Sequence, residues 1–125
     1  ERCLDEATNY SKIRVTFGQP LAQRQAIQWM LADSAIDIYA TRLMTYNTIW
    51  KFEQGEDIRS EISMVKVFAT EMATRVADRA IQIHGGLGLT TDLPLERIYR
   101  GLRIMRIVEG ASEVHRMVVA RRLLA

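Results

Sequence analysis

The sequence predicts an all-α protein, an antiparallel up-and-down bundle of about four main helices plus one short helix. Apolar residues recur at steps of three and four along several segments. Glycine and proline gather between most of these segments, where they end helices. No segment alternates apolar and polar residues between hairpin turns, as half-buried strands do. At 125 residues, we expect one domain, residues 1–125, with one core.

The first helix is expected from about Arg2 to near Val15, because Gly18 and Pro20 interrupt helical hydrogen bonding. A loop follows. The second helix is expected from Leu21 to about Phe52, a stretch without glycine or proline, and Gly55 ends it. Its apolar residues at helical spacing are Ile27, Leu31, Ala35 and Ile38.

The third helix, expected from about Asp57 or Ile58 to Ile83, has the clearest pattern. The stripe predicted to be buried is Ile62, Val65, Ala69, Met72, Val76 and Ala80. Its small residues would let a neighbouring helix approach closely. Most other positions are expected to contact solvent, through Lys66, Glu71, Arg75, Asp78 and Arg79.

The short helix is expected to follow a cap at Thr91 or Asp92, with Pro94 near its first turn, and to end by Met105. The last helix is expected from about Ser112, a plausible N-cap, to Leu124. The arginines near the end of the chain are expected to form ion pairs and interfaces.

Composition excludes several classes of function. Seventeen basic and fifteen acidic residues leave a net charge of +2, and they alternate along the chain, which argues against binding to nucleic acid or a membrane surface. No apolar run approaches the ~20 residues of a membrane span. One cysteine and two separated histidines predict neither a disulfide nor a metal site, and fit a reducing compartment. The chain begins without methionine, so we expect a piece of a longer protein.

Two stretches suggest chemistry. Glu109 precedes the last helix, where the positive end of the helix dipole favours a carboxylate and would keep a base ionised. The alternative is an acid that only complements the dipole. The glycines after His84 could cap the third helix or expose amides to an anion. His84 itself could serve the last helical carbonyls or bind a ligand.

Taken together, four stretches resemble the acyl-CoA dehydrogenase family: Arg14–Leu21 (RVTFGQPL), Arg24–Ile27 (RQAI), Gln82–Gly88 (QIHGGLG) and Glu109–Glu113 (EGASE). The resemblance covers nearly the whole chain, but only the C-terminal helical domain of such enzymes. Their N-terminal helical domain and central β-domain have no counterpart here. In this family FAD lies between subunits, and the C-terminal bundle of one protomer contributes to the flavin of its neighbour.

The resemblance implies roles for particular residues. Arg14 matches the arginine that meets the flavin pyrophosphate, a role suited to a permanently charged planar donor. Further cofactor contacts are implied for Phe17, Gln25, Gln82, Ile83, His84, Gly85, Gly86, Ser112 and Glu113. Glu109 matches the base that removes the α-proton of an acyl-CoA, and Gly110 leaves room for the thioester. No metal is implied.

Departures from the family pattern bear on the substrate. Val108 stands where relatives often have tyrosine, and Ala111 where threonine is usual. We expect the smaller residue at 108 to contact substrate and to admit a branched or bulkier acyl group.

The resemblance also implies partners: an electron-transfer flavoprotein as electron acceptor and a homo-oligomer, tetramer or dimer, formed through the C-terminal bundle. It implies the cytoplasm of a bacterium or the mitochondrial matrix of a eukaryote. Two alternatives stay open. One is an acyl-CoA oxidase-like flavoenzyme that passes electrons to oxygen, and the other is a non-catalytic helical oligomerisation module.

Overall fold

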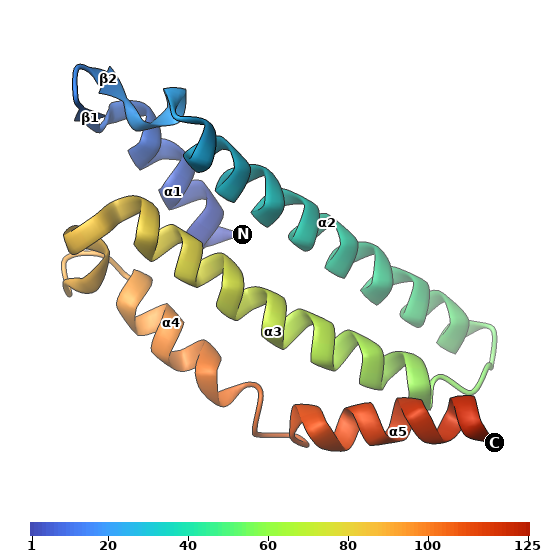
Figure 1. Cartoon of the computed structure of the whole chain (residues 1–125). Coiled ribbons are helices and arrows are strands. Elements are labelled where there is room, and N and C mark those ends of the chain that lie inside the picture. Colours follow the sequence, from blue (N-terminus) through green and yellow to red (C-terminus); the bar gives the residue numbers. More distant parts are fainter.

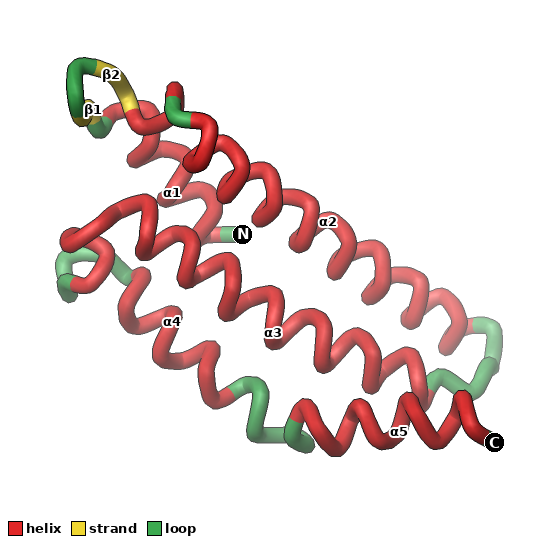
Figure 2. Tube along the Cα trace, in the orientation of Figure 1, coloured by secondary structure: helices red, strands yellow, loops and turns green.

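The computed structural model describes all residues 1–125 and is a bundle of five α-helices with one small hairpin (Figures 1 and 2). The helices are α1 (Arg2–Ile13), α2 (Gln25–Glu53), α3 (Arg59–His84), α4 (Leu95–Ile104) and α5 (Ser112–Leu124). The all-α prediction is confirmed. Helix α3 is the centre of the bundle, because each of the other four helices packs against it. None of the helices is both long and apolar enough to cross a bilayer.

The predicted loop between the first two helices contains a hairpin. Strand β1 (Val15–Thr16) pairs antiparallel with β2 (Gln19–Pro20), and the short 3-10 helix η1 (Leu21–Gln23) follows. Phe17 and Gly18 both have positive φ, +49° and +80°, as the central residues of a type I′ turn require. Helix α2 therefore begins at Gln25 rather than Leu21. Proline in β2 has no N–H to donate, which ends helical bonding as expected.

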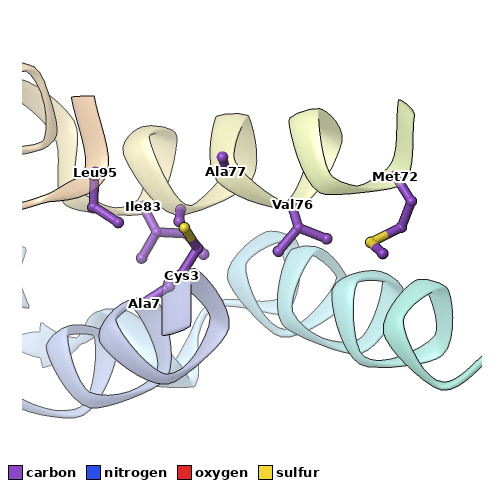
Figure 3. Close-up of a cluster of buried hydrophobic side chains, with 8 residues drawn as sticks. Cys3, Ala7, Met72, Val76, Ala77, Ile83 and Leu95 are labelled. Atoms are coloured by element: carbon purple, nitrogen blue, oxygen red, sulfur yellow. The ribbon is translucent and has the colours of Figure 1, made fainter. Parts of the chain in front are cut away.

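The core lies along α3, where it meets α1 and α4. The buried apolar residues of α3 are Met72, Val76, Ala77, Ala80 and Ile83. They pack with Cys3 and Ala7 of α1 and with Leu95 of α4 (Figure 3). Alanine at the contact lets the helices approach closely. The predicted stripe extends too far toward the start of α3, since Ile62 is exposed, where α1 does not reach (Figure 1).

Helix α2 shows two different faces. Toward the bundle, Ser34 and Thr48 are buried and bond to carbonyls one turn back, at 2.7 and 2.9 Å. Asp37 pairs with Arg75 and Arg79 of α3, at 3.3 and 3.0 Å. The outward face carries exposed large apolar residues: Trp29, Ile36, Tyr39, Leu43, Tyr46 and Trp50. Ala35, expected on the inner stripe, is exposed.

Candidate active site

Glu109 lies at the corner between α4 and α5, three residues before α5 begins, as the sequence predicted. It is exposed, and its φ is +56°. A residue other than glycine rarely adopts positive φ, and such positions concentrate at functional sites. Its carboxylate takes part in none of the ion pairs of the structure. The corner therefore presents a free carboxylate on a constrained backbone.

The backbone of this corner is bonded to α3 and α5. Lys66 Nζ of α3 donates to the carbonyls of Val108, at 3.0 Å, and Gly110, at 2.5 Å. His115 Nε2 of α5 lies 3.1 Å from the carbonyl oxygen of Glu109. Gly110 has φ +92°, and a Cβ on it would lie 2.8 Å from His115 Nε2. Glycine is thus required at 110 by its φ and by the neighbouring imidazole.

A second link joins the two arms of the corner to α3. Glu71 accepts a hydrogen bond from Arg116, at 2.8 Å, and pairs with Arg106 at 3.7 Å. The Arg116 hydrogen bond lowers the pKa of Glu71 below its ordinary value, against the opposing effect of burial. The prediction that Glu71 is a solvated surface position is wrong, because its side chain is only 20% exposed. Local spacing could not show this, since both arginines come from segments far along the chain.

Ser112 is not the N-cap of α5. That position is Ala111, with extended ψ of 153°, and no side chain caps the helix. The Ser112 side chain is buried and faces Glu71, whose pKa it lowers further, although no hydrogen bond of ordinary geometry joins the two. The prediction failed because Ser112 is the first helical residue and its hydroxyl turns toward α3.

Other residues assigned by the resemblance lie around the hairpin. Arg14 is exposed and joins no ion pair, and Gln25 is the exposed first residue of α2. Phe17 is 98% exposed at its strained backbone position. The guanidinium of Arg24 lies 5.4 Å from its ring centre, within range of a cation–π contact. A cationic, partly aromatic surface forms at this end of the bundle.

The end of α3 combines buried and open positions. The His84 ring is buried, lies 2.8 Å from the Ala80 carbonyl through Nδ1, and stacks on Tyr10 with centroids 4.3 Å apart. This contact agrees with the alternative in which His84 serves carbonyls near the end of the helix, and its role toward a ligand stays a prediction. Ile83 is also buried, whereas Gln82, Gly85 and Gly86 are exposed. A Cβ at Gly86 would meet no atom within 4 Å, so that backbone is open to approach.

The assigned residues fall into two separate groups within one chain. The hairpin and the glycines after α3 lie at the same end of the bundle, and the Glu109 corner lies at the far end of α4 (Figure 1). A ten-residue helix spans about 15 Å. The structure therefore does not bring Glu109 beside the paired glycines of its own chain. Nor does it place three or more potential metal ligands together.

Three residues that shape the corner, Lys66, Glu71 and His115, were not recognised from the sequence. Their bonds to the corner join residues as many as 45 positions apart. No local spacing signals such contacts. The nearest signal in the sequence is the glycine at position 110, because a glycine there indicates that another group lies close to the backbone.

The fold and the sequence identify the class. Residues 1–124 match the family model described as acyl-CoA dehydrogenase, C-terminal domain, so the chain belongs to this family. It is 50% identical over 125 residues to (R)-benzylsuccinyl-CoA dehydrogenase of Thauera aromatica. That match covers 99% of this chain but 31% of the relative. The chain thus spans about a third of the length of its curated relatives.

Further relatives include the human mitochondrial short-chain specific acyl-CoA dehydrogenase, 42% identical over 99% of this chain and 30% of the relative. The caffeyl-CoA reductase-Etf complex subunit CarC of Acetobacterium woodii is 40% identical, over 97% of this chain and 32% of that protein. These three relatives are named as dehydrogenases or reductases of CoA thioesters, and one of them is named as a subunit of a complex with an electron-transfer flavoprotein.

Solved structures of the same family have the same fold as this chain. Butyryl-CoA dehydrogenase of Megasphaera elsdenii superposes with a TM-score of 0.95 at 37% identity, covering 98% of this chain and 32% of that one. The FAD complex of PigA superposes with a TM-score of 0.94 at 31% identity, with the same coverage. The bundle is therefore that of a domain found in proteins that bind FAD.

Proposed function

We propose that this chain is the C-terminal domain of an FAD-dependent acyl-CoA dehydrogenase, which converts an acyl-CoA thioester to a 2,3-enoyl-CoA with Glu109 as the base. The observation that carries the proposal is the free carboxylate of Glu109 at a corner whose backbone is bonded on both sides. A carboxylate without an ion-pair partner is available to accept a proton. The resemblance of EGASE to the family's catalytic stretch supports the same residue.

The chemistry requires a base in a fixed place. The α-hydrogen of a thioester is a weak acid, so Glu109 must lie within hydrogen-bond reach of it while hydride leaves the β-carbon. The electron pair of the α-C–H bond then forms the carbon–carbon double bond. When bound, FAD supplies the acceptor for the hydride. A small displacement of the carboxylate costs rate, since proximity and orientation contribute much of the acceleration.

The group at the hairpin end fits a dinucleotide. Arg14 is unpaired and would meet a pyrophosphate, and Phe17 and Gln25 offer an exposed ring and an amide to the ADP portion. Gln82 and the open glycines provide further donors. Ile83 and His84 would contribute through their backbone, because their side chains are buried. Glu113, exposed at the start of α5, would approach the flavin at the other end of α4, and Ser112 would support that end from inside, because its side chain is buried.

The partners follow from the family. We expect electrons to pass to an electron-transfer flavoprotein, as the name of the Acetobacterium relative indicates for that protein, and we expect protomers to assemble through these bundles. By itself the chain is expected to be inactive, since it spans about a third of its relatives' length. An oxidase-like enzyme would use the same base and differ only in passing electrons to oxygen.

The test is Glu109→Gln in the full-length flavoenzyme that contains this domain. Removing the base should lower turnover of an acyl-CoA at least ~100-fold, while the protein still purifies yellow. Glu53→Gln is the matched control, because Glu53 is exposed and unpaired at the end of α2. Turnover of Glu109→Gln within a few-fold of the wild type would show that the base is assigned wrongly.

Val108 supports a proposal for the substrate. Val108 directly precedes Glu109 in the sequence and its side chain is exposed, and the Thauera relative is named for an acyl group that carries a bulky benzyl substituent. We expect Val108→Tyr to lower kcat/KM for branched or aryl-bearing acyl-CoAs at least ten-fold more than for straight chains. The aromatic ring of tyrosine adds more bulk beside the substrate than the single methylene that already gives ten-fold or greater discrimination. An unchanged preference would remove this residue from the specificity argument.

A further inference from the structure

Three successive carbonyls around Glu109 are all occupied by side chains of other helices. Lys66 Nζ donates to the carbonyls of Val108 and Gly110, which flank Glu109 on both sides. His115 Nε2 lies 3.1 Å from the carbonyl of Glu109 itself. The peptide groups before and after the Glu109 Cα are therefore fixed from α3 and α5. The direction of the Cα–Cβ bond follows from them.

This backbone does not hold its shape by itself. Positive φ at two consecutive residues, Glu109 and Gly110, is disfavoured for the glutamate, by about 1–3 kcal/mol at such sites. Such a conformation persists only where surrounding contacts stabilise it. The only side-chain hydrogen bonds to the backbone of residues 108–110 come from Lys66 and His115. Backbone hydrogen bonds from Val108 N to the Ile104 carbonyl and from Ser112 N to the Arg106 carbonyl close the corner on either side, and Lys66 and His115 are the side chains that stabilise it.

The His115 ring is held by contacts of both of its nitrogen atoms. A carbonyl only accepts, so His115 Nε2 carries the hydrogen in this bond. The other ring nitrogen, Nδ1, lies 3.2 Å from Oγ of Ser63, which is buried on α3. Ser63 precedes Lys66 by three residues on α3, so one face of that helix supplies Lys66 and orients His115.

We infer that Lys66 and His115 are positioning residues for the catalytic carboxylate of Glu109. The inference rests on the proposed function of Glu109. Lys66 and His115 touch backbone rather than substrate, and they act by fixing the corner that aims Glu109. They should therefore affect the rate of proton abstraction more than the affinity for substrate or FAD. Gly110 belongs to the same arrangement, because any larger residue would collide with His115 Nε2.

The experiment compares Lys66→Met with Lys66→Arg, which keeps a cationic donor, in the full-length flavoenzyme with an acyl-CoA as substrate. Lys66→Met should lower kcat at least ten-fold with KM within about three-fold and flavin content unchanged, because misplacing a catalytic group by 1 Å can cost about 100-fold. Lys66→Arg should recover most of the rate. Arg103→Met is the matched control, a nearby exposed cation that joins no ion pair and donates no side-chain hydrogen bond.

A double variant separates positioning from general destabilisation. In a Glu109→Gln background, Lys66→Met should have little further effect, since residues that act through one group are not additive. A full additional loss would show that Lys66 only supports the fold and would overturn the inference. The inference would also be overturned if Lys66→Met turned over within two-fold of the wild type while Glu109→Gln was inactive. That result would leave the proposed function of Glu109 intact. Activity in Glu109→Gln itself would instead overturn the proposed function.

His115 provides an independent route if Lys66→Met fails to retain flavin. His115→Phe keeps a ring of similar size but has no donor for the Glu109 carbonyl, and His115→Gln restores an N–H. A ten-fold lower kcat in His115→Phe that His115→Gln recovers supports the inference. Equal rates in the two variants and the wild type contradict it.

Discussion

At the scale of single residues, Glu71 links the corner to α3 through its charge. Its side chain is 20% exposed and pairs with Arg106 and Arg116, so the pKa of this carboxyl is lowered from its ordinary value of 4.5. Because the pKa is lower in the folded than in the unfolded chain, the ion pairs stabilise the fold above the unfolded pKa. That contribution is lost as the pH falls through the folded pKa.

We therefore predict that Glu71→Gln lowers the free energy of unfolding at pH 7 by about 1.5–3 kcal/mol, the usual contribution of hydrogen bonds to charged groups. The loss relative to wild type should shrink as the pH falls below about 4.5. Chemical denaturation at a series of pH values measures both. Asp78→Asn is the control, since Asp78 is exposed on the same helix and joins no ion pair. A difference that is constant with pH would show that the charge of Glu71 is not the cause.

Residue roles were predictable from sequence only where the signal is local. The place of Glu109 before a helix, the use of His84 at the end of α3, and the helical stripe through Met72 and Val76 all follow from spacing within a few residues. The fixing of residues 108–110 by Lys66 and His115 does not, because it depends on how α3 and α5 pack. Ser112 shows the same limit: its type suits a cap, but the corner turns its hydroxyl toward Glu71.

At the scale of elements, α2 carries an apolar stripe that the bundle does not use. Trp29, Ile36, Tyr39, Leu43, Tyr46 and Trp50 follow one another at steps of seven, three or four residues and are all exposed. Such spacing forms a seam for packing against another helix. Large contiguous apolar surfaces of this kind mark contact sites. The expected homo-oligomer gives this face a partner.

We predict that Leu43→Glu together with Tyr46→Lys shifts the protein from oligomer toward monomer, because charges in an apolar seam must be desolvated on assembly. Both positions face solvent in the single chain, so helix content should not change. Sedimentation velocity gives the oligomeric state, and circular dichroism gives the helix content. The matched pair Asn9→Glu and Asp78→Lys, at exposed positions of α1 and α3 that join no ion pair, should leave assembly as it was. An unchanged sedimentation coefficient in the seam variant would contradict the assignment of this face.

The hairpin is an element that the sequence pattern did not reveal. Two strands of two residues each are too short for an alternating pattern to be read. Gly18 and Pro20 did predict that the helix stops. The turn type depends on positive φ at Phe17, which residue type does not indicate, since phenylalanine seldom adopts it.

At the scale of the whole molecule, the two groups of assigned residues occupy opposite ends of α4 (Figure 1). The order of the helices and the buried stripe of α3 were predictable from hydrophobic periodicity. The separation of the two groups was not, since it depends on the path of α4 across the bundle. If one protomer contributes to the flavin of its neighbour, as the family resemblance implies, each active site combines Glu109 of one chain with Arg14 of another. The separation within one chain is then what the assembly requires.

This arrangement predicts complementation between two inactive variants. Arg14→Ala should lose flavin. Glu109→Gln should keep flavin but lose turnover at least ~100-fold, because it removes the base. When the two are co-expressed with different tags and the mixed oligomer is purified through both, one class of site unites an intact Arg14 with an intact Glu109. Mixed oligomers should then regain a quarter to a half of wild-type activity, because the other class of site carries both defects. The measurement is turnover per protomer in the doubly purified fraction, with each variant alone as the control. If Arg14 and Glu109 served the same site from one chain, every site would keep one defect and no activity would return.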